Sequence, residues 1–204
     1  MNHTRRVALG DGSVILKQSV PWVAKYPDIA APADRVLQEA RFYQMVYAHP
    51  AVAGMMPDLV GVDTENRVIA LSDLGASADL TYLYRKDEQV SDEQRDALAD
   101  WLAHLHGLAY PPEDRRALRN EAMRRLNHEH LFRFPLDPDN GLDLDAITPG
   151  LAGLAENIRR DRLFCDTVHE LGETIYLADG DTLIHGDPFP GSFLRTAAGI
   201  RAID

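Results

Sequence analysis

The first third of the chain alternates short apolar runs with polar turns. Val7–Leu9 and Val14–Leu16 flank a Gly-Asp-Gly-Ser segment. Asp-Gly between two such runs is typical of a hairpin, because the turn needs residues that tolerate positive φ. Residues 59–62 and 67–71 repeat the pattern around a second polar turn. We therefore predict two antiparallel strand pairs, with Lys17 at the end of the second strand.

One helix is predicted between these strand pairs. A Pro-punctuated loop covers residues 21–32. Asp34 then has the residue type of a helix N-cap, and the helix would run to about Ala48. Its apolar stripe recurs at helical spacing and consists of Val36, Ala40, Tyr43 and Tyr47. Strands and helix together indicate a small sheet lobe.

The pattern becomes helical after residue 77. The clearest helix covers residues 92–108, where Ser91 and Gln94 form a capping box. Its apolar face consists of Leu98, Trp101, Leu102 and Leu105. This change predicts an α+β fold with a sheet lobe over residues 1–77 and a mostly helical lobe over 78–204.

The rest of the helical lobe is less regular. Helices are predicted at 113–127 and 151–177, the second broken near Gly172, with an irregular loop at 133–150 between them. A turn then leads into a short strand at 182–184.

The last residues carry the densest pattern of chemical groups. An apolar pair precedes His185-Gly186-Asp187, Ser192 follows five positions after the aspartate, and a second apolar run ends on Asp204, 17 positions after Asp187. In phosphoryl transfer, one aspartate accepts the acceptor hydroxyl's proton while another binds Mg²⁺. The spacing predicts such a pair here.

Three upstream features complete the pattern. Lys17 ends an apolar strand, and Glu39 lies 22 positions further on in the predicted helix. A strand-borne lysine can neutralise nucleotide phosphates while a helix-borne glutamate holds it as an ion pair. The connector over residues 72–77 can offer backbone donors and acceptors to a purine edge.

These motifs resemble those of the aminoglycoside-phosphotransferase and choline-kinase group, which are small-molecule kinases with a protein-kinase-like fold. Their catalytic loop reads His-Gly-Asp, as residues 185–187 do. Within that group, segments 14–21 and 185–192 are most similar to those of 5-methylthioribose kinases. The resemblance implies transfer of phosphate from ATP to a small hydroxyl-bearing acceptor, with a sugar-like, methylthioribose-type molecule favoured over an aminoglycoside.

The resemblance also assigns roles to residues. Asp187 would be the catalytic base, and Lys17 would hold the ATP phosphates with Glu39 behind it. The connector from Ser72 to Leu74 would line the adenine pocket through backbone groups. Mg²⁺ would be bound by Asp204 and by Ser192, which stands where most relatives have asparagine.

Two parts of such a kinase are expected to be missing. The Gly-rich loop lies further upstream of the lysine strand than the sixteen residues before Lys17 allow, and the helices of the acceptor site follow the metal-binding aspartate. We expect a chain truncated at both ends. A catalytically silent nucleotide-binding fragment or pseudokinase is therefore an alternative, as is a metal-dependent phosphohydrolase that uses His185, Asp187 and Asp204.

Charge and composition limit which binding partners and which cellular location the protein can have. The net charge of −11 argues against a nucleic-acid partner. The chain lacks a signal-peptide pattern and an apolar run of membrane-spanning length, which predicts a cytoplasmic protein without a membrane partner. The single cysteine, Cys165, excludes an internal disulfide. The sequence leaves open whether the protein is a monomer or a homodimer.

Overall fold

The computed structural model describes residues 2–23 and 26–203. The chain divides into two compact units. The first contains the described residues up to Arg119 together with those from Asp181 onward, and the second is formed by residues 120–180.

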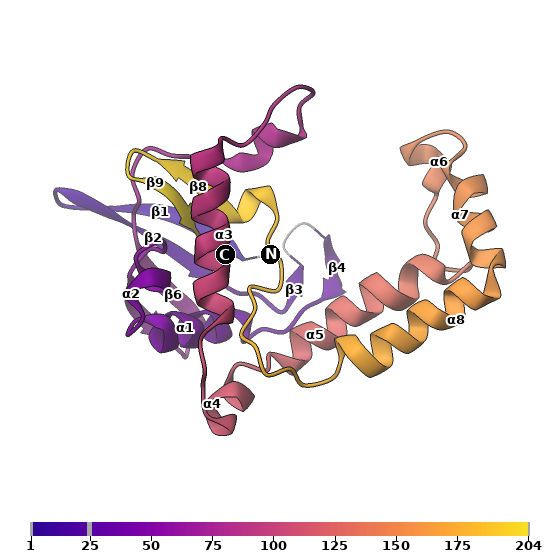
Figure 1. The fold of residues 1–204 in the computed structure, drawn as a ribbon, viewed down its shortest axis with the longest axis horizontal. Coiled ribbons are helices and arrows are strands. Elements are labelled where there is room, and N and C mark those ends of the chain that lie inside the picture. Colours follow the sequence, from indigo (N-terminus) through magenta and orange to yellow (C-terminus); the bar gives the residue numbers. More distant parts are fainter. Residues whose placement is uncertain (1, 24–25, 204) are drawn as a thin grey trace. The chain divides into compact units, whose positions relative to one another are not determined.

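The first unit contains a sheet with the strand order β1-β2-β6-β5, in which all neighbours are antiparallel (Figure 1). Its strands are β1 (His3–Leu9), β2 (Gly12–Gln18), β5 (Leu59–Asp63) and β6 (Val68–Ser72). Both predicted strand pairs are confirmed. Gly10 has a φ of +55° in the β1–β2 turn, a conformation that glycine adopts without strain.

Residues 22–23 and 26–30, predicted as part of a loop, form a small antiparallel ribbon instead. It pairs β3 (Trp22–Val23) with β4 (Tyr26–Ala30). Aromatic and β-branched residues favour extended backbone here and outweigh the prolines that suggested a loop. Pro27 is compatible with this ribbon because each of its two strands has an unpaired edge.

The predicted helix after this ribbon is α1 (Arg35–Val46), followed by the short α2 (Pro50–Ala53). Asp34 occupies the N-cap position, but its carboxylate pairs with Arg67 Nε at 2.7 Å and makes no cap hydrogen bond. Tyr47, predicted on the apolar stripe, is the C-cap residue of α1 and is 78% exposed.

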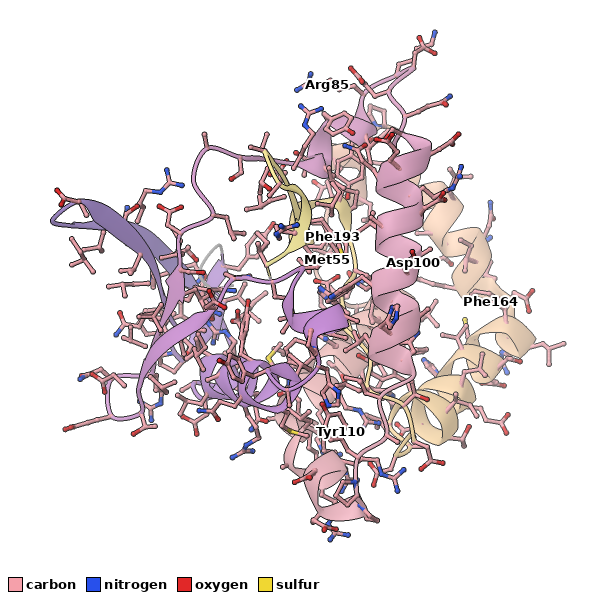
Figure 2. The ribbon with its side chains drawn as sticks, turned by 60° about the vertical axis from the view of Figure 1, so that its left-hand side comes forward. Met55, Arg85, Asp100, Tyr110, Phe164 and Phe193 are labelled. Carbon is pink, nitrogen blue, oxygen red and sulfur yellow. The ribbon has the colours of Figure 1, made fainter. Side chains whose placement is uncertain are left out.

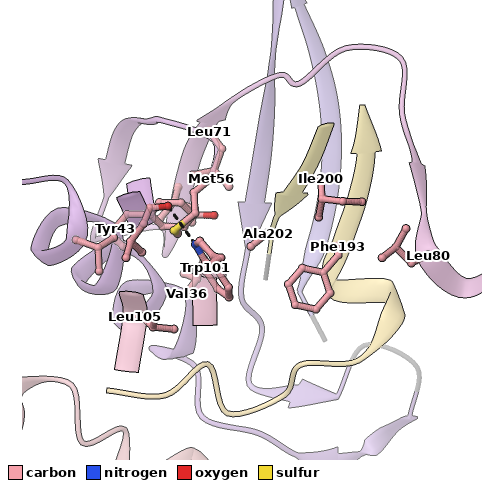
Figure 3. Packing of buried hydrophobic residues seen from close by; sticks show 14 residues of the cluster. Val36, Tyr43, Met56, Leu71, Leu80, Trp101, Leu105, Phe193, Ile200 and Ala202 are labelled. Carbon is pink, nitrogen blue, oxygen red and sulfur yellow. Dashed lines mark hydrogen bonds between the residues drawn. The ribbon is translucent and has the colours of Figure 1, made fainter. Parts of the chain in front are cut away.

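The main core of the first unit lies between the sheet and these helices (Figure 3). Trp101 is 1% exposed, and its indole N–H donates to the carbonyl oxygen of Val52 at 3.1 Å. The core contains residues from both sides of residue 77, among them Val36, Tyr43, Ile69, Leu80, Trp101, Leu105 and Phe193.

A second sheet joins distant segments of the first unit. It has the order β7-β8-β9, with β7 (Ala78–Asp79), β8 (Phe193–Thr196) and β9 (Gly199–Ala202). Helix α3 (Asp92–His106) runs beside β8 and β9 (Figure 1) and has the predicted capping box at Ser91. The amide of Ala202 also donates to the carbonyl oxygen of Met55 at 2.7 Å, which ties β9 to the end of α2 (Figure 2).

The prediction of one continuous helix over residues 113–127 is wrong. The structure contains α4 (Pro112–Ala117) in the first unit and α5 (Glu121–His128) in the second. Asn120 has a φ of +46° between them, and such a left-handed residue interrupts a helix.

The second unit continues with α6 (Leu144–Ile147), α7 (Leu151–Arg160) and α8 (Arg162–Leu171). The break predicted near Gly172 lies at Asp161 instead, where the carboxylate accepts from the Phe164 amide and starts α8. Residues 172–176 continue the helix as a π-helical turn.

An aromatic stack holds the two long helical segments of the second unit together. The ring of His128 stacks on Phe132 at a centroid distance of 5.6 Å, and Phe132 lies 5.0 Å from Tyr176. Gly172 is buried beside this stack, where a side chain would collide with His128 and Phe132. Large apolar side chains of α7 and α8 stay exposed, among them Leu154 and Leu163. Phe164, labelled in Figure 2, is also exposed.

The α+β class is confirmed, with strands and helices largely segregated along the chain. The short strand predicted at 182–184 is absent, since these residues have no strand partner, although Leu183 packs against the core. The lobe boundary near residue 77 stays a prediction. No helix among the described residues has the length and apolar character that membrane crossing requires.

Candidate functional site

Lys17 and Glu39 form a buried ion pair in the first unit. Alternation along β2 places Lys17 on the same face as Ile15, which packs against the core. Lys17 Nζ lies 2.7 Å from Glu39 Oε1 of α1, with the two side chains 8% and 14% exposed. A cation can be buried at this depth because a carboxylate partner offsets part of its lost hydration. The predicted pairing is therefore present in the structure.

The same ammonium contacts the far end of the chain. Lys17 Nζ donates to the carbonyl oxygen of Ile203 at 3.3 Å. The segment after β9 thus reaches the lysine of β2. Asp204, predicted to bind Mg²⁺, lies outside the described residues, and its role stays a prediction.

The His185-Gly186-Asp187 segment is anchored on the core by its histidine. The His185 ring lies 5.9 Å from Trp101 and 5.8 Å from Phe193 between centroids. Its Nδ1 accepts a hydrogen bond from the Asp187 amide at 3.3 Å. Gly186 has a φ of +92°, which a residue with a side chain rarely adopts. This arrangement leaves Asp187 exposed, so its carboxylate is accessible to a ligand.

Ser192 connects this loop to β9. Its hydroxyl donates to the carbonyl oxygen of Asp187 at 3.0 Å, and its own carbonyl oxygen accepts from the Ile203 amide at 3.0 Å. A continuous path of hydrogen bonds therefore runs from Lys17 through Ile203 and Ser192 to Asp187. The sequence places these residues far apart, and the structure brings them together.

The connector after β6 is held by side chains that sequence reasoning did not identify. Asp73 accepts from Ser13 Oγ at 2.6 Å and pairs with Arg6 Nε at 2.6 Å. The hydrogen bond from Ser13, then that from the Gly75 amide and the contacts with Arg6, lower the pKa of Asp73 below its ordinary value of 3.8. A Ser-Asp-x-Gly sequence after a strand is typical of such an Asx turn and could have revealed it.

Ser72 and Leu74, predicted to line an adenine pocket, differ in what their backbone can offer. Ser72 exchanges hydrogen bonds with Asp58, using its amide at 2.9 Å and its hydroxyl at 2.8 Å. Leu74 is half-buried, and its amide and carbonyl make no hydrogen bond to other described residues. Leu74 therefore has the free donor and acceptor that a purine edge requires.

The position of a surface depression and the distribution of metal-binding side chains also bear on where the site lies. A depression lined by residues of α1, β5 and the segment between them, including Tyr47, Met56 and Val62, contains none of the predicted site residues. Within residues 2–23 and 26–203, no three His, Cys, Asp or Glu side chains gather closely enough to hold a metal ion. The described site thus contains the buried Lys17–Glu39 pair and the exposed Asp187 carboxylate, linked by hydrogen bonds through Ile203 and Ser192.

The family of the chain follows from its sequence, and its fold from a comparison with solved structures. The sequence profile of the phosphotransferase enzyme family (APH) matches residues 2–204, and the chain belongs to this family. Among solved structures, the choline kinase LicA from Streptococcus pneumoniae is similar, with a TM-score of 0.51 and 13% identity. The match covers 98% of this chain and 58% of LicA. At this identity the likeness shows the kinase-like fold alone. No curated protein matches the chain significantly.

Proposed function

We propose that the chain is the part of an ATP-dependent small-molecule kinase that binds the nucleotide and carries the catalytic aspartate. The observation that supports this proposal most is the hydrogen-bonded path from the Lys17–Glu39 pair through Ile203 and Ser192 to Asp187. A buried, oriented ammonium and an exposed carboxylate on a fixed loop are the two charges that phosphoryl transfer requires.

The residues fit a nucleotide in the following way. Lys17 would neutralise the phosphates while Glu39 fixes its ammonium, and the free backbone groups of Leu74 would pair with the purine. Asp187 would orient the acceptor hydroxyl and take its proton. Bound Mg²⁺ supplies charge neutralisation of the phosphates, and Asp204 would hold it.

For the acceptor, we propose a sugar-like hydroxyl compound of the methylthioribose type. The support is the similarity of segments 14–21 and 185–192 to those of 5-methylthioribose kinases. LicA is a choline kinase by name, and choline is therefore a second acceptor to test, together with an aminoglycoside. Transfer of phosphate to one of the three compounds identifies the acceptor class.

Replacing Asp187 tests the assignment of the catalytic base. We expect Asp187→Asn to lower the rate of phosphate transfer at least about 100-fold, since general-base catalysis contributes this much or more. Binding of ATP with Mg²⁺, measured by calorimetry, should change little because Lys17 and Leu74 are untouched. Asp181→Asn is a matched control, because this exposed aspartate precedes the loop and pairs with Arg115 instead.

The outcomes separate this proposal from its alternatives. Turnover by Asp187→Asn at the wild-type rate would contradict it. Nucleotide binding without transfer in the wild-type chain would favour a silent nucleotide-binding module. Release of phosphate without any acceptor would favour a phosphohydrolase.

A further inference from the structure

Ser192 occupies a buried position whose main chain is fixed from two sides. The residue is 1% exposed and lies between the 3-10 turn Pro190–Ser192 and β8. Its amide donates to the Phe189 carbonyl oxygen at 2.9 Å, and its carbonyl oxygen accepts from the Ile203 amide at 3.0 Å. These two hydrogen bonds fix the main chain of Ser192 relative to the end of β9.

That hydroxyl completes the hydrogen bonding of one peptide group. The carbonyl oxygen of Asp187 accepts from Ser192 Oγ at 3.0 Å and from the Phe189 amide at 3.0 Å, so both of its lone pairs are used. On the other side of the residue, the Asp187 amide donates to His185 Nδ1 at 3.3 Å. The backbone of Asp187 is thus held on both sides while its carboxylate stays exposed.

We propose that Ser192 is a positioning residue for Asp187 and acts through this main-chain hydrogen bond, in place of a role as a metal ligand. The inference rests on the proposed function for its catalytic meaning. With both peptide groups fixed, only the two side-chain torsions of Asp187 remain to be ordered when an acceptor binds. A loop without this bond would place the carboxylate in many orientations, most of them unproductive.

The two roles of Ser192 predict different behaviour in the metal-free protein. A residue that acts only as a ligand leaves the empty loop unchanged when its hydroxyl is removed. A positioning residue loosens the loop whether or not metal and nucleotide are present. The decisive measurement is therefore made on the protein alone.

The experiment compares the wild-type chain with Ser192→Ala by amide hydrogen exchange and ¹⁵N relaxation, without metal or nucleotide. We expect exchange of the Asp187 and Phe189 amides to accelerate about five- to tenfold, the equivalent of one net hydrogen bond. The Ile203 amide serves as an internal control, since its acceptor is the Ser192 main chain. Ser192→Thr, which keeps the hydroxyl, should restore slow exchange.

Ser19→Ala provides a matched control variant. Ser19 is also buried, in the first unit, and its hydroxyl also donates to a backbone carbonyl, that of Ala33. It should lose similar stability without changing exchange at Asp187 or Phe189. In phosphate-transfer assays, Ser192→Ala should lower kcat at least about tenfold, with less than about a threefold change in the Mg²⁺ concentration for half-maximal rate.

Each result has one meaning. Unchanged exchange at Asp187 and Phe189 in Ser192→Ala would overturn the positioning role, as would a large shift of the Mg²⁺ midpoint with kcat preserved. If the wild-type chain binds no nucleotide, the proposed function fails, and the exchange data still decide whether Ser192 holds Asp187 in place.

Discussion

At the scale of single residues, the candidate site depends on a buried pair of opposite charges. Lys17 is almost fully buried, and Glu39 shares its environment on the facing helix. Burying a charge is costly unless a partner of opposite sign lies close. The pair is therefore poor support for stability by itself, which is consistent with the proposed role of Lys17 in binding phosphate.

A double-mutant cycle on Lys17 and Glu39 tests this view. Lys17→Met should destabilise the fold by about 3 kcal/mol, because the Glu39 carboxylate loses its ammonium partner in a buried place. Adding Glu39→Leu should recover most of that loss while ATP binding stays weak. Denaturant unfolding and calorimetric titration with ATP measure the two effects. Recovery of ATP affinity together with stability would contradict a phosphate-binding role for Lys17.

Asp73 gives a residue-scale prediction about pH. Its folded-state pKa lies below 3.8 because Ser13, the Gly75 amide and Arg6 stabilise the charged carboxylate. A depressed pKa stabilises the fold above the unfolded-state value, and this contribution disappears as pH falls through the folded value. We expect the difference in unfolding free energy between wild type and Asp73→Asn to be constant from neutral pH to about 5 and to shrink below 3.8. A difference that does not vary with pH would contradict the assignment.

At the scale of elements, the secondary structure of the first unit is determined by neighbouring residues to a greater extent than that of the second. The hairpin turn at Gly10 and the capping box at Ser91 are encoded by neighbouring residues, and both are present as predicted. The second unit depends instead on how two helical segments meet. His128 and Phe132 on one segment pack against Tyr176 on the other, and both segments contain π-helical turns at this contact.

Gly172 is the residue that permits this contact. A Cβ there would lie 2.7 Å from His128 Nε2 and 2.8 Å from Phe132 Cγ. We expect Gly172→Ala to destabilise the second unit by about 1–3 kcal/mol through overpacking, despite the better helix propensity of alanine. Gly153→Ala in α7 is the control, because its Cβ would meet no atom within 4 Å. It should stabilise the helix by about 0.5–1 kcal/mol. Hydrogen exchange of the α5 and α8 amides measures the change in stability that each substitution causes. Equal effects of the two substitutions would contradict a steric clash at position 172.

At the scale of the whole molecule, the sequence predicted the contact between Lys17 and Glu39 better than the packing of the chain around the predicted site residues. The Lys17–Glu39 pair followed from a strand and a helix that local patterns identify. The role of His185 as a core residue packed on Trp101 did not, because packing between residues 84 positions apart leaves no local pattern. The break at Asn120 was also missed, since a left-handed asparagine inside a polar, helix-favouring stretch has no distinctive neighbours.

The contact between Lys17 and Ile203 has a consequence for how the protein folds. These residues are 186 positions apart, and the pairing of Ala78 with Arg195 also closes a long loop of more than 100 residues. Closing such long loops is entropically expensive and slow compared with forming the β1–β2 hairpin. During synthesis, strands and helices encoded early must therefore wait for residues 193–203 to leave the ribosome before the site exists. A nascent chain stalled before that point should display a formed hairpin and no nucleotide affinity.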